Sequence, residues 1–169
     1  MFLMLTKGLQ TWGFECVKFH TLEDLEAYYH SRGELIVGGI GIIRKRLAKF
    51  DITPPTVDYP EELIHYLGRP VTEMSLSDIA NHPEKWPGVF VQYGQILDCK
   101  HYWGDPLKFP SAEIIKFAIR DYTSAPDAYG IDFGVTRDAK TLLMEVNDAW
   151  ALGCYGLEAH LYAKFLVTR

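Results

Sequence analysis

Residues 129–147 hold two runs in which apolar and polar side chains alternate, and a short polar segment joins them. Such alternation is typical of β-strands with one buried face. The apolar positions are Tyr129, Ile131, Phe133 and Val135 in the first run, and Leu142, Met144 and Val146 in the second. A tight turn at Asp138 and Ala139 would join the two strands into a hairpin. The hairpin restricts the chain to folds that contain an antiparallel sheet.

The rest of the chain adds helices and further short strands to this hairpin. Expected helices cover residues 2–14, 21–33, 40–50, 61–67, 75–81, 111–122 and 157–166, and expected strands cover residues 15–19, 34–39, 89–91 and 95–100. A turn at Tyr93-Gly94 should join the last two strands into a second hairpin. The expected helix caps are Gly13 at the end of the first helix, Thr21 with Asp24 at the start of the second, and Ser111 at the start of the helix in residues 111–122. The fold class predicted is α/β, or more narrowly α+β: an N-terminal strand-helix layer, followed by a mostly antiparallel sheet with helices on one face.

Prolines at positions 54, 55 and 60 prevent a helix from crossing this region, which we interpret as an extended connector. The predicted organisation is therefore an N-terminal α/β lobe in residues 1–53, a connector with short helices in residues 54–88, and a C-terminal lobe in residues 89–169.

Composition excludes several classes of protein. The chain has 169 residues, of which 48% are hydrophobic and 23% charged, as in ordinary globular proteins. The formal charge of the chain is -5, and a negatively charged protein is repelled by a phosphate backbone, so we expect no nucleic-acid partner. The longest apolar run, residues 35–43, is well short of the roughly 20 residues that cross a bilayer. Three widely spaced cysteines favour a reducing compartment, and we expect a cytoplasmic protein without membrane contact.

The polar face of the 129–147 hairpin carries a candidate metal site. A two-residue turn would pair Asp132 directly with Glu145, and Asn147 would follow on the same face. Two carboxylates opposed across a sheet repel each other unless a positive charge lies between them. Mg²⁺ would supply that charge, since it binds carboxylate and amide oxygens and leaves positions for water and phosphate. The alternative, which residue types alone favour, is the solvent face of an amphipathic hairpin.

Two other segments offer weaker phosphate sites. Lys100 and His101 lie at the end of an expected strand near Asp98, where they would contact phosphate or substrate, unless they are simply an exposed pair. Glycines at positions 38, 39 and 41 lie between an expected strand and a helix, where backbone N–H groups can cradle phosphate. Close packing of that turn is the favoured alternative, since the segment has neither a third glycine at dinucleotide-binding spacing nor a phosphate-binding lysine.

The hairpin motifs resemble a known family. Ile-Asp-Phe-Gly-Val at residues 131–135, followed by Leu-Met-Glu-Val-Asn-Asp at residues 143–148, is similar to the metal-binding strand pair of the ATP-grasp superfamily. Leu-Gly-Cys-Tyr-Gly-Leu at residues 152–157 resembles a segment of an uncharacterised ATP-grasp clade common in bacteria and phages. Shorter matches lie at residues 58–63, 67–69, 86–87 and 96–105. The resemblance implies an ATP-grasp-like fold, with Mg²⁺ and ATP as cofactors and Asp132, Glu145 and Asn147 as the metal ligands.

One departure from the family pattern leaves two hypotheses. The strand at residues 89–91 is followed at once by Gln92-Tyr93-Gly94, where family members insert a central lobe with two phosphate-binding lysines. The first hypothesis is an ATP-dependent carboxylate-amine or carboxylate-thiol ligase, which would bind a nucleotide and a small-molecule carboxylate and act through an acyl phosphate. The second is a catalytically inactive, shortened relative that serves as a binding or oligomerising module, with a homo-oligomer as its expected state.

Overall fold

A computed structural model describes residues 7–27, 36–53, 59–68, 88–101, 104–149 and 152–168. The chain forms two compact units. Unit 1 comprises residues 1–56 and 148–169, and unit 2 comprises residues 57–147. The two ends of the chain therefore belong to the same unit. The predicted division into residues 1–53, 54–88 and 89–169 stays a prediction.

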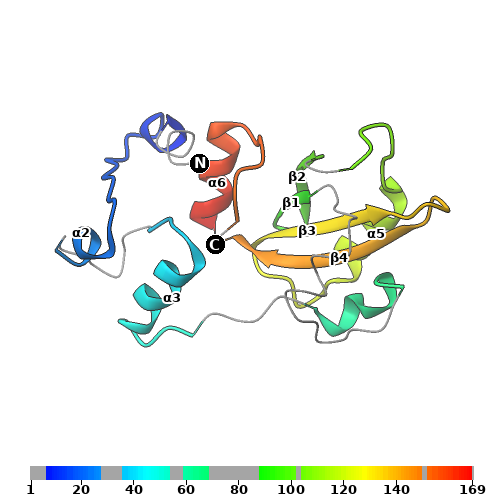
Figure 1. The fold of residues 1–169 in the computed structure, drawn as a ribbon, viewed down its shortest axis with the longest axis horizontal. Coiled ribbons are helices and arrows are strands. Elements are labelled where there is room, and N and C mark those ends of the chain that lie inside the picture. Colours follow the sequence, from blue (N-terminus) through cyan, green and yellow to red (C-terminus); the bar gives the residue numbers. More distant parts are fainter. Residues whose placement is uncertain are drawn as a thin grey trace. The chain divides into compact units, whose positions relative to one another are not determined.

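Unit 2 is built on a four-stranded sheet with strand order β2-β1-β3-β4 (Figure 1). The strands are β1 (Gly88–Gln92), β2 (Gln95–Lys100), β3 (Ala128–Val135) and β4 (Thr141–Asp148), of which the last residue belongs to unit 1. β1 pairs antiparallel with both β2 and β3. Tyr93 and Gly94 both have positive φ, which matches the tight turns that join right-twisted strands, so the predicted β1-β2 hairpin is confirmed. The expected α+β fold with an antiparallel sheet is confirmed as well.

Helices cover one face of this sheet. The 3₁₀ helix η1 (Glu61–Tyr66) and the helix α5 (Ala112–Asp121) contribute apolar side chains to a single core cluster with β1, β3 and β4. As predicted, Ser111 caps α5, and its hydroxyl accepts a hydrogen bond from the Ile114 N–H at 3.4 Å. The central members of the core are Leu63, Leu67, Val89, Val91, Ile115, Ile119, Tyr129, Ile131 and Phe133.

Two polar contacts join η1 to the end of α5. The Tyr66 hydroxyl donates to Asp121 Oδ2 at 2.7 Å, and the Ser124 N–H donates to Glu62 Oε1 at 3.0 Å. Burial and the bond to Asp121 raise the pKa of Tyr66 to about 12. The same bond lowers the pKa of Asp121, because hydrogen bonding favours the ionised carboxylate. These contacts hold η1 against α5, and so fix the helical layer of unit 2.

The described elements of unit 1 are helices. These are a single helical turn at residues 7–10, and the helices α2 (Leu22–Ala27), α3 (Ile40–Ala48) and α6 (Ala159–Thr168). The predicted caps are present: Gly13 ends the first turn with φ of 80°, and Thr21 with Asp24 forms a reciprocal pair of 3.0 Å hydrogen bonds before α2. The buried side chains of α6 are Tyr162, Ala163, Phe165 and Leu166.

Some predicted elements differ from the structure. Residues 15–19 and 36–39 form no strand, and no described residue pairs with them. A strand needs a partner for its backbone groups, so an apolar run without one stays irregular. The helix predicted at residues 61–67 is a 3₁₀ helix, and the helix predicted at residues 75–81 lies outside the described residues. None of the helices described is long and apolar enough to cross a membrane.

Candidate functional site

The β3-β4 turn has three residues, 137–139, so the predicted two-residue turn at Asp138 and Ala139 is wrong. The Thr136 N–H donates to the Lys140 carbonyl at 2.9 Å, and the Ala139 N–H donates to the Thr136 carbonyl at 3.0 Å. Ala139 takes a left-handed conformation with φ of 60°, which is typical of the last residue in a three-residue hairpin loop. Thr136 therefore faces Lys140, one residue away from the predicted register.

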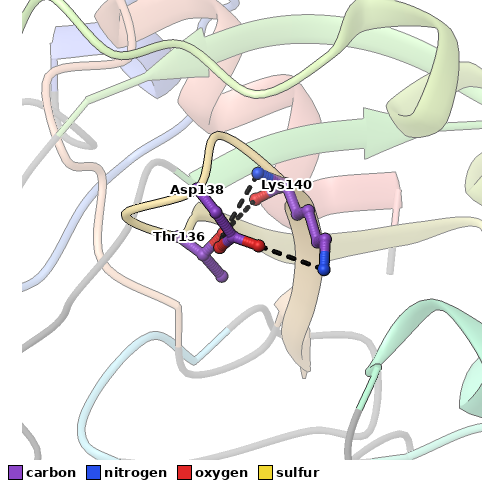
Figure 2. A network of polar contacts seen from close by, with 3 residues as sticks. All are labelled: Thr136, Asp138 and Lys140. Carbon is purple, nitrogen blue, oxygen red and sulfur yellow. Dashed lines mark hydrogen bonds and ion pairs between the residues drawn. The ribbon is translucent and has the colours of Figure 1, made fainter.

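Three side chains hold this turn together, as Figure 2 shows. The Thr136 hydroxyl donates to Asp138 Oδ1 at 2.6 Å and accepts from the Lys140 N–H at 3.0 Å. Lys140 Nζ lies 3.0 Å from Asp138 Oδ2. The bond from Thr136, followed by the contact with Lys140, lowers the pKa of Asp138 to about 2. The turn thus fixes the end of the two strands that carry the candidate metal ligands.

Asp132 lies at one end of a row of residues that crosses three strands of the sheet. In the register of the strands, Asp132 is opposite Gly88, and Gly88 is opposite Lys100. Directly opposed residues share one face of a sheet, so Lys100 and Asp132 project from the same face, about 10 Å apart at the backbone. Gly88 has no side chain to fill the space between them. Asp132 lies between Ile131 and Phe133, which point into the core, and is itself 7% exposed.

Burial along β4 does not follow the regular alternation that we predicted. The buried residues of β4 are Leu143 and Val146, whereas Met144 is only half-buried, so alternation is interrupted between them. A regular strand would carry Glu145 to the core face with Leu143. Glu145 and Asn147 flank the buried Val146, so both side chains lie on the face of β4 opposite to Val146.

The Glu145 and Asn147 side chains are in direct contact. Asn147 Nδ2 donates to Glu145 Oε1 at 3.0 Å. A carboxylate and an amide are thus held within coordination range of a common point, and both offer oxygens of the kind that Mg²⁺ binds. In the described part of the chain, no three His, Cys, Asp or Glu side chains gather closely enough to hold a metal ion. The predicted ligand set differs from such a cluster because its third donor is an amide.

Positive charge on this face comes from β2. Lys100 Nζ lies 2.8 Å from Asp98 Oδ2, and Asp98 is opposite Phe90 in the register, on the same face as Lys100. His101 directly follows the strand. Sequence reasoning missed the Asp98–Lys100 ion pair and the position of Gly88, because both depend on strand pairing. The (i, i+2) spacing of Asp98 and Lys100 on a strand was the one signal that could have revealed the pair.

The glycines at positions 38, 39 and 41 lie in unit 1, at the start of α3. Among the described residues, a Cβ atom at Gly39 or Gly41 would meet no atom within 4 Å, and one at Gly38 would make only ordinary contacts. The expected close packing of this turn is therefore wrong. No described feature brings the segment together with another phosphate-binding group.

Unit 2 is thus an α+β domain, an antiparallel sheet with η1 and α5 packed on one face and Asp132 and Lys100 on the other. A family model described as an ATP-grasp domain, the second family of its clade, matches residues 88–165. The match begins at the first residue of β1 and includes all four strands, α5 and most of α6. This segment belongs to the ATP-grasp superfamily, as the resemblance predicted.

The match covers slightly less than half of the chain, in agreement with a shortened domain. No curated protein matches the sequence significantly.

Proposed function

We propose that this protein binds Mg²⁺-ATP on the sheet face that carries Asp132, Glu145 and Asn147. Two observations support this: the burial of the Asp132 carboxylate on β3, and the contact between Glu145 and Asn147 on β4, both within the segment that matches the ATP-grasp domain. Mg²⁺ usually takes one or two carboxylates from a protein and keeps its other positions for water and phosphate oxygens. Two carboxylates and one amide therefore suit a magnesium ion that also bridges nucleotide phosphates.

Each residue has a distinct role in this proposal. Asp132 supplies the most buried carboxylate, and a charge in such a place needs compensation by a cation or by hydrogen bonds. Glu145 supplies the second carboxylate. Asn147 now donates its amide to Glu145, and a half-turn of the amide group would present its oxygen to the metal instead. Lys100 and His101 would contact phosphate or substrate from the β2 end of the face.

The reaction proposed is that of an ATP-dependent carboxylate-amine or carboxylate-thiol ligase. Bound Mg²⁺-ATP supplies the phosphoryl group, and the metal neutralises charge on the phosphate oxygens. A substrate carboxylate oxygen attacks the γ-phosphorus, ADP leaves, and an acyl phosphate results. The amine or thiol then attacks the acyl carbon, and inorganic phosphate leaves. The chain contributes by holding the metal with Asp132 and Glu145, and by holding phosphate oxygens with Lys100.

A second candidate function is a binding or oligomerising module without turnover. It is favoured by exposed apolar side chains in unit 2, with Leu107 86% exposed and Phe109 69% exposed. Large apolar side chains that gather on a surface are typical of interfaces. In this case the mass in solution would be a multiple of 19.3 kDa.

Thermal unfolding with ATP, with Mg²⁺ and with both tests the binding site. Ligand at 100 times its dissociation constant stabilises a protein by about 2.7 kcal/mol, which is a shift of several degrees at this size. We expect the shift only when both are present, and we expect Asp132→Asn and Glu145→Gln to abolish it. The matched control is Glu113→Gln on α5, an exposed carboxylate on the opposite side of the sheet, which should keep the full shift. A shift that survives Asp132→Asn would contradict the metal assignment.

Trapping with hydroxylamine separates the ligase from the binding module. An acyl phosphate reacts with hydroxylamine to give a stable hydroxamate, so incubation with ATP, Mg²⁺ and a mixture of small carboxylates should release ADP and form hydroxamate in equal amounts. Binding of Mg²⁺-ATP without either product, together with a mass above 19.3 kDa by light scattering, would replace the ligase by the oligomerising module.

A further inference from the structure

Unit 2 has an apolar pocket on the side of the sheet opposite to Asp132. Its volume is about 290 Å³. The sheet contributes Val89, Ile96 and Cys99, and α5 contributes Ile115 and Lys116. Phe109, in the segment before α5, forms a further wall and is itself 69% exposed. Neither the proposed metal ligands nor Lys100 line this pocket.

The pocket exists because one helix is too narrow to cover four strands. A helix is about 10 Å across and strands are about 4.8 Å apart, so α5 covers roughly two of them. Within the described core, β1, β3 and β4 each contribute side chains to the main cluster, whereas β2 contributes none. β2 lies at one edge of the sheet, and its Ile96 remains 42% exposed beside the hollow. The space between β2 and α5 is thus a place where apolar surface lacks cover from the described residues.

The chemistry of the lining defines the ligand. All the lining side chains are apolar or weakly polar except Lys116. Lys116 is exposed, lines the pocket with the apolar part of its side chain, and makes no ion pair with any residue in the described ranges, so its flexible side chain can bring the ammonium group to an anion at the mouth of the pocket. Burial and the nearby Asp98 carboxylate raise the pKa of the Cys99 thiol, which leaves Cys99 uncharged as part of the wall. One positive charge beside an apolar hollow is complementary to an anion with an apolar body.

We propose that this pocket binds a small amphipathic anion, an aromatic monocarboxylate, with its ring between Val89, Ile96 and Ile115 and its carboxylate beside Lys116. A cavity of roughly 150 Å³ holds benzene, so this one has the size for a two-ring body. The site is separate from the proposed nucleotide face, because it lies on the α5 side of the sheet. The proposal therefore does not rest on the proposed function.

The test compares three probes of one shape and different charge: 1-naphthoate, 1-naphthylmethanol and 1-naphthylmethylamine. Each is titrated into the full chain while backbone amide shifts are followed by two-dimensional NMR. We expect naphthoate to bind tightest and the amine weakest, with shift changes in β2, in residues 107–116 and in α5. An exposed charge pair contributes up to about 1 kcal/mol, which is a factor of about five in affinity.

Two variants and one control locate the site. Lys116→Gln should weaken naphthoate about fivefold and leave naphthylmethanol unchanged. Ala112→Leu places a larger side chain in the wall of the pocket from an exposed helix position, so it should abolish binding of all three probes without unfolding the chain. Lys45→Gln, an exposed lysine on α3, should change nothing. Equal affinities for the three probes, shift changes confined to the Asp132 face or to unit 1, or full binding by Ala112→Leu would each overturn the proposal.

Discussion

The two units of this chain are stabilised in different ways. Unit 2 has a sheet whose strands pair across long sequence distances, and one continuous core joins this sheet to η1 and α5. Unit 1 has short helices, and its segment at residues 14–19 is irregular, with Phe14 53% exposed and Val17 49% exposed. All the candidate metal ligands lie in unit 2, as do Lys100 and His101. Residues that must hold a metal ion to within a fraction of an ångström benefit from paired strands, which fix side-chain direction better than isolated helical turns.

The largest expected effect tests the role of the unit 2 core. Phe133 is fully buried in the core cluster, and Phe133→Ala should lower the free energy of unfolding by about 3–5 kcal/mol. The same change at the exposed Phe14 of unit 1 should cost less than about 0.5 kcal/mol. Urea unfolding followed by circular dichroism measures both. Equal losses of unfolding free energy in the two variants would show that the buried core of unit 2 does not contribute more to stability than the exposed segment of unit 1.

The next effect tests packing within unit 1. A Cβ atom at Gly8 would overlap the Ala159 carbonyl oxygen and lie 2.8 Å from the Ala163 side chain, so residues 7–10 pass very close to α6. Gly8→Ala should cost about 1–3 kcal/mol. Gly41→Ala is the matched control, since its Cβ would meet no atom of the described residues within 4 Å and alanine favours the α3 helix by about 0.5–1 kcal/mol.

Amide hydrogen exchange shows where each glycine change acts. Gly8→Ala should speed exchange in α6 and leave the β1-β3 ladder protected. Faster exchange in both places would mean that the two units unfold together.

Local patterns predicted most of the elements that the structure contains. The alternation in residues 129–147 predicted β3 and β4, and Ser111 predicted the start of α5, because burial with a period of two and helix capping depend on near neighbours. The apolar run at residues 15–19 has the composition of a strand but no partner in the described chain. Composition cannot supply that partner, and the prediction failed there.

The candidate site was predictable in its residue types but not in its geometry. The three-residue turn shifts the register by one residue, and burial at Leu143 and Val146 departs from regular alternation. Neither feature can be recognised from the alternation of residue types. At the turn, the residue with the left-handed conformation is Ala139, and alanine is not a residue typical of that conformation. The row that joins Asp132, Gly88 and Lys100 depends on pairing between segments far apart in sequence. Strand pairing therefore had to be seen before the positive charge near Asp132 could be recognised.

Replacement by phenylalanine should change the free energy of unfolding in opposite directions at two buried tyrosines. Tyr129 in unit 2 is fully buried, with its hydroxyl unpartnered among the described residues, whereas the Tyr162 hydroxyl in unit 1 donates to the Leu152 carbonyl at 2.7 Å. A buried polar group without a partner costs stability, and a satisfied one contributes about 1 kcal/mol. Tyr129→Phe should therefore raise the free energy of unfolding by up to about 1 kcal/mol, and Tyr162→Phe should lower it by a similar amount. Destabilisation by Tyr129→Phe would point to a bound water on that hydroxyl.

The smallest expected effect is a pH dependence at the β3-β4 turn. The pKa of Asp138 is about 2 in the folded chain, below its ordinary value of 3.8, because Thr136 and Lys140 favour the ionised carboxylate. A carboxyl group with a lowered pKa contributes stability that is complete above its unfolded pKa and is lost as the pH falls through the folded value. Stability should therefore decline between about pH 4 and pH 2, and part of that decline should be absent in Asp138→Asn, as measured by urea unfolding at each pH.

Asp24 of unit 1 also has a lowered pKa, from hydrogen bonds with the backbone N–H groups of His20 and Thr21. Asp24→Asn should remove a different part of the acid response, and the double variant should remove both parts if the two units titrate independently.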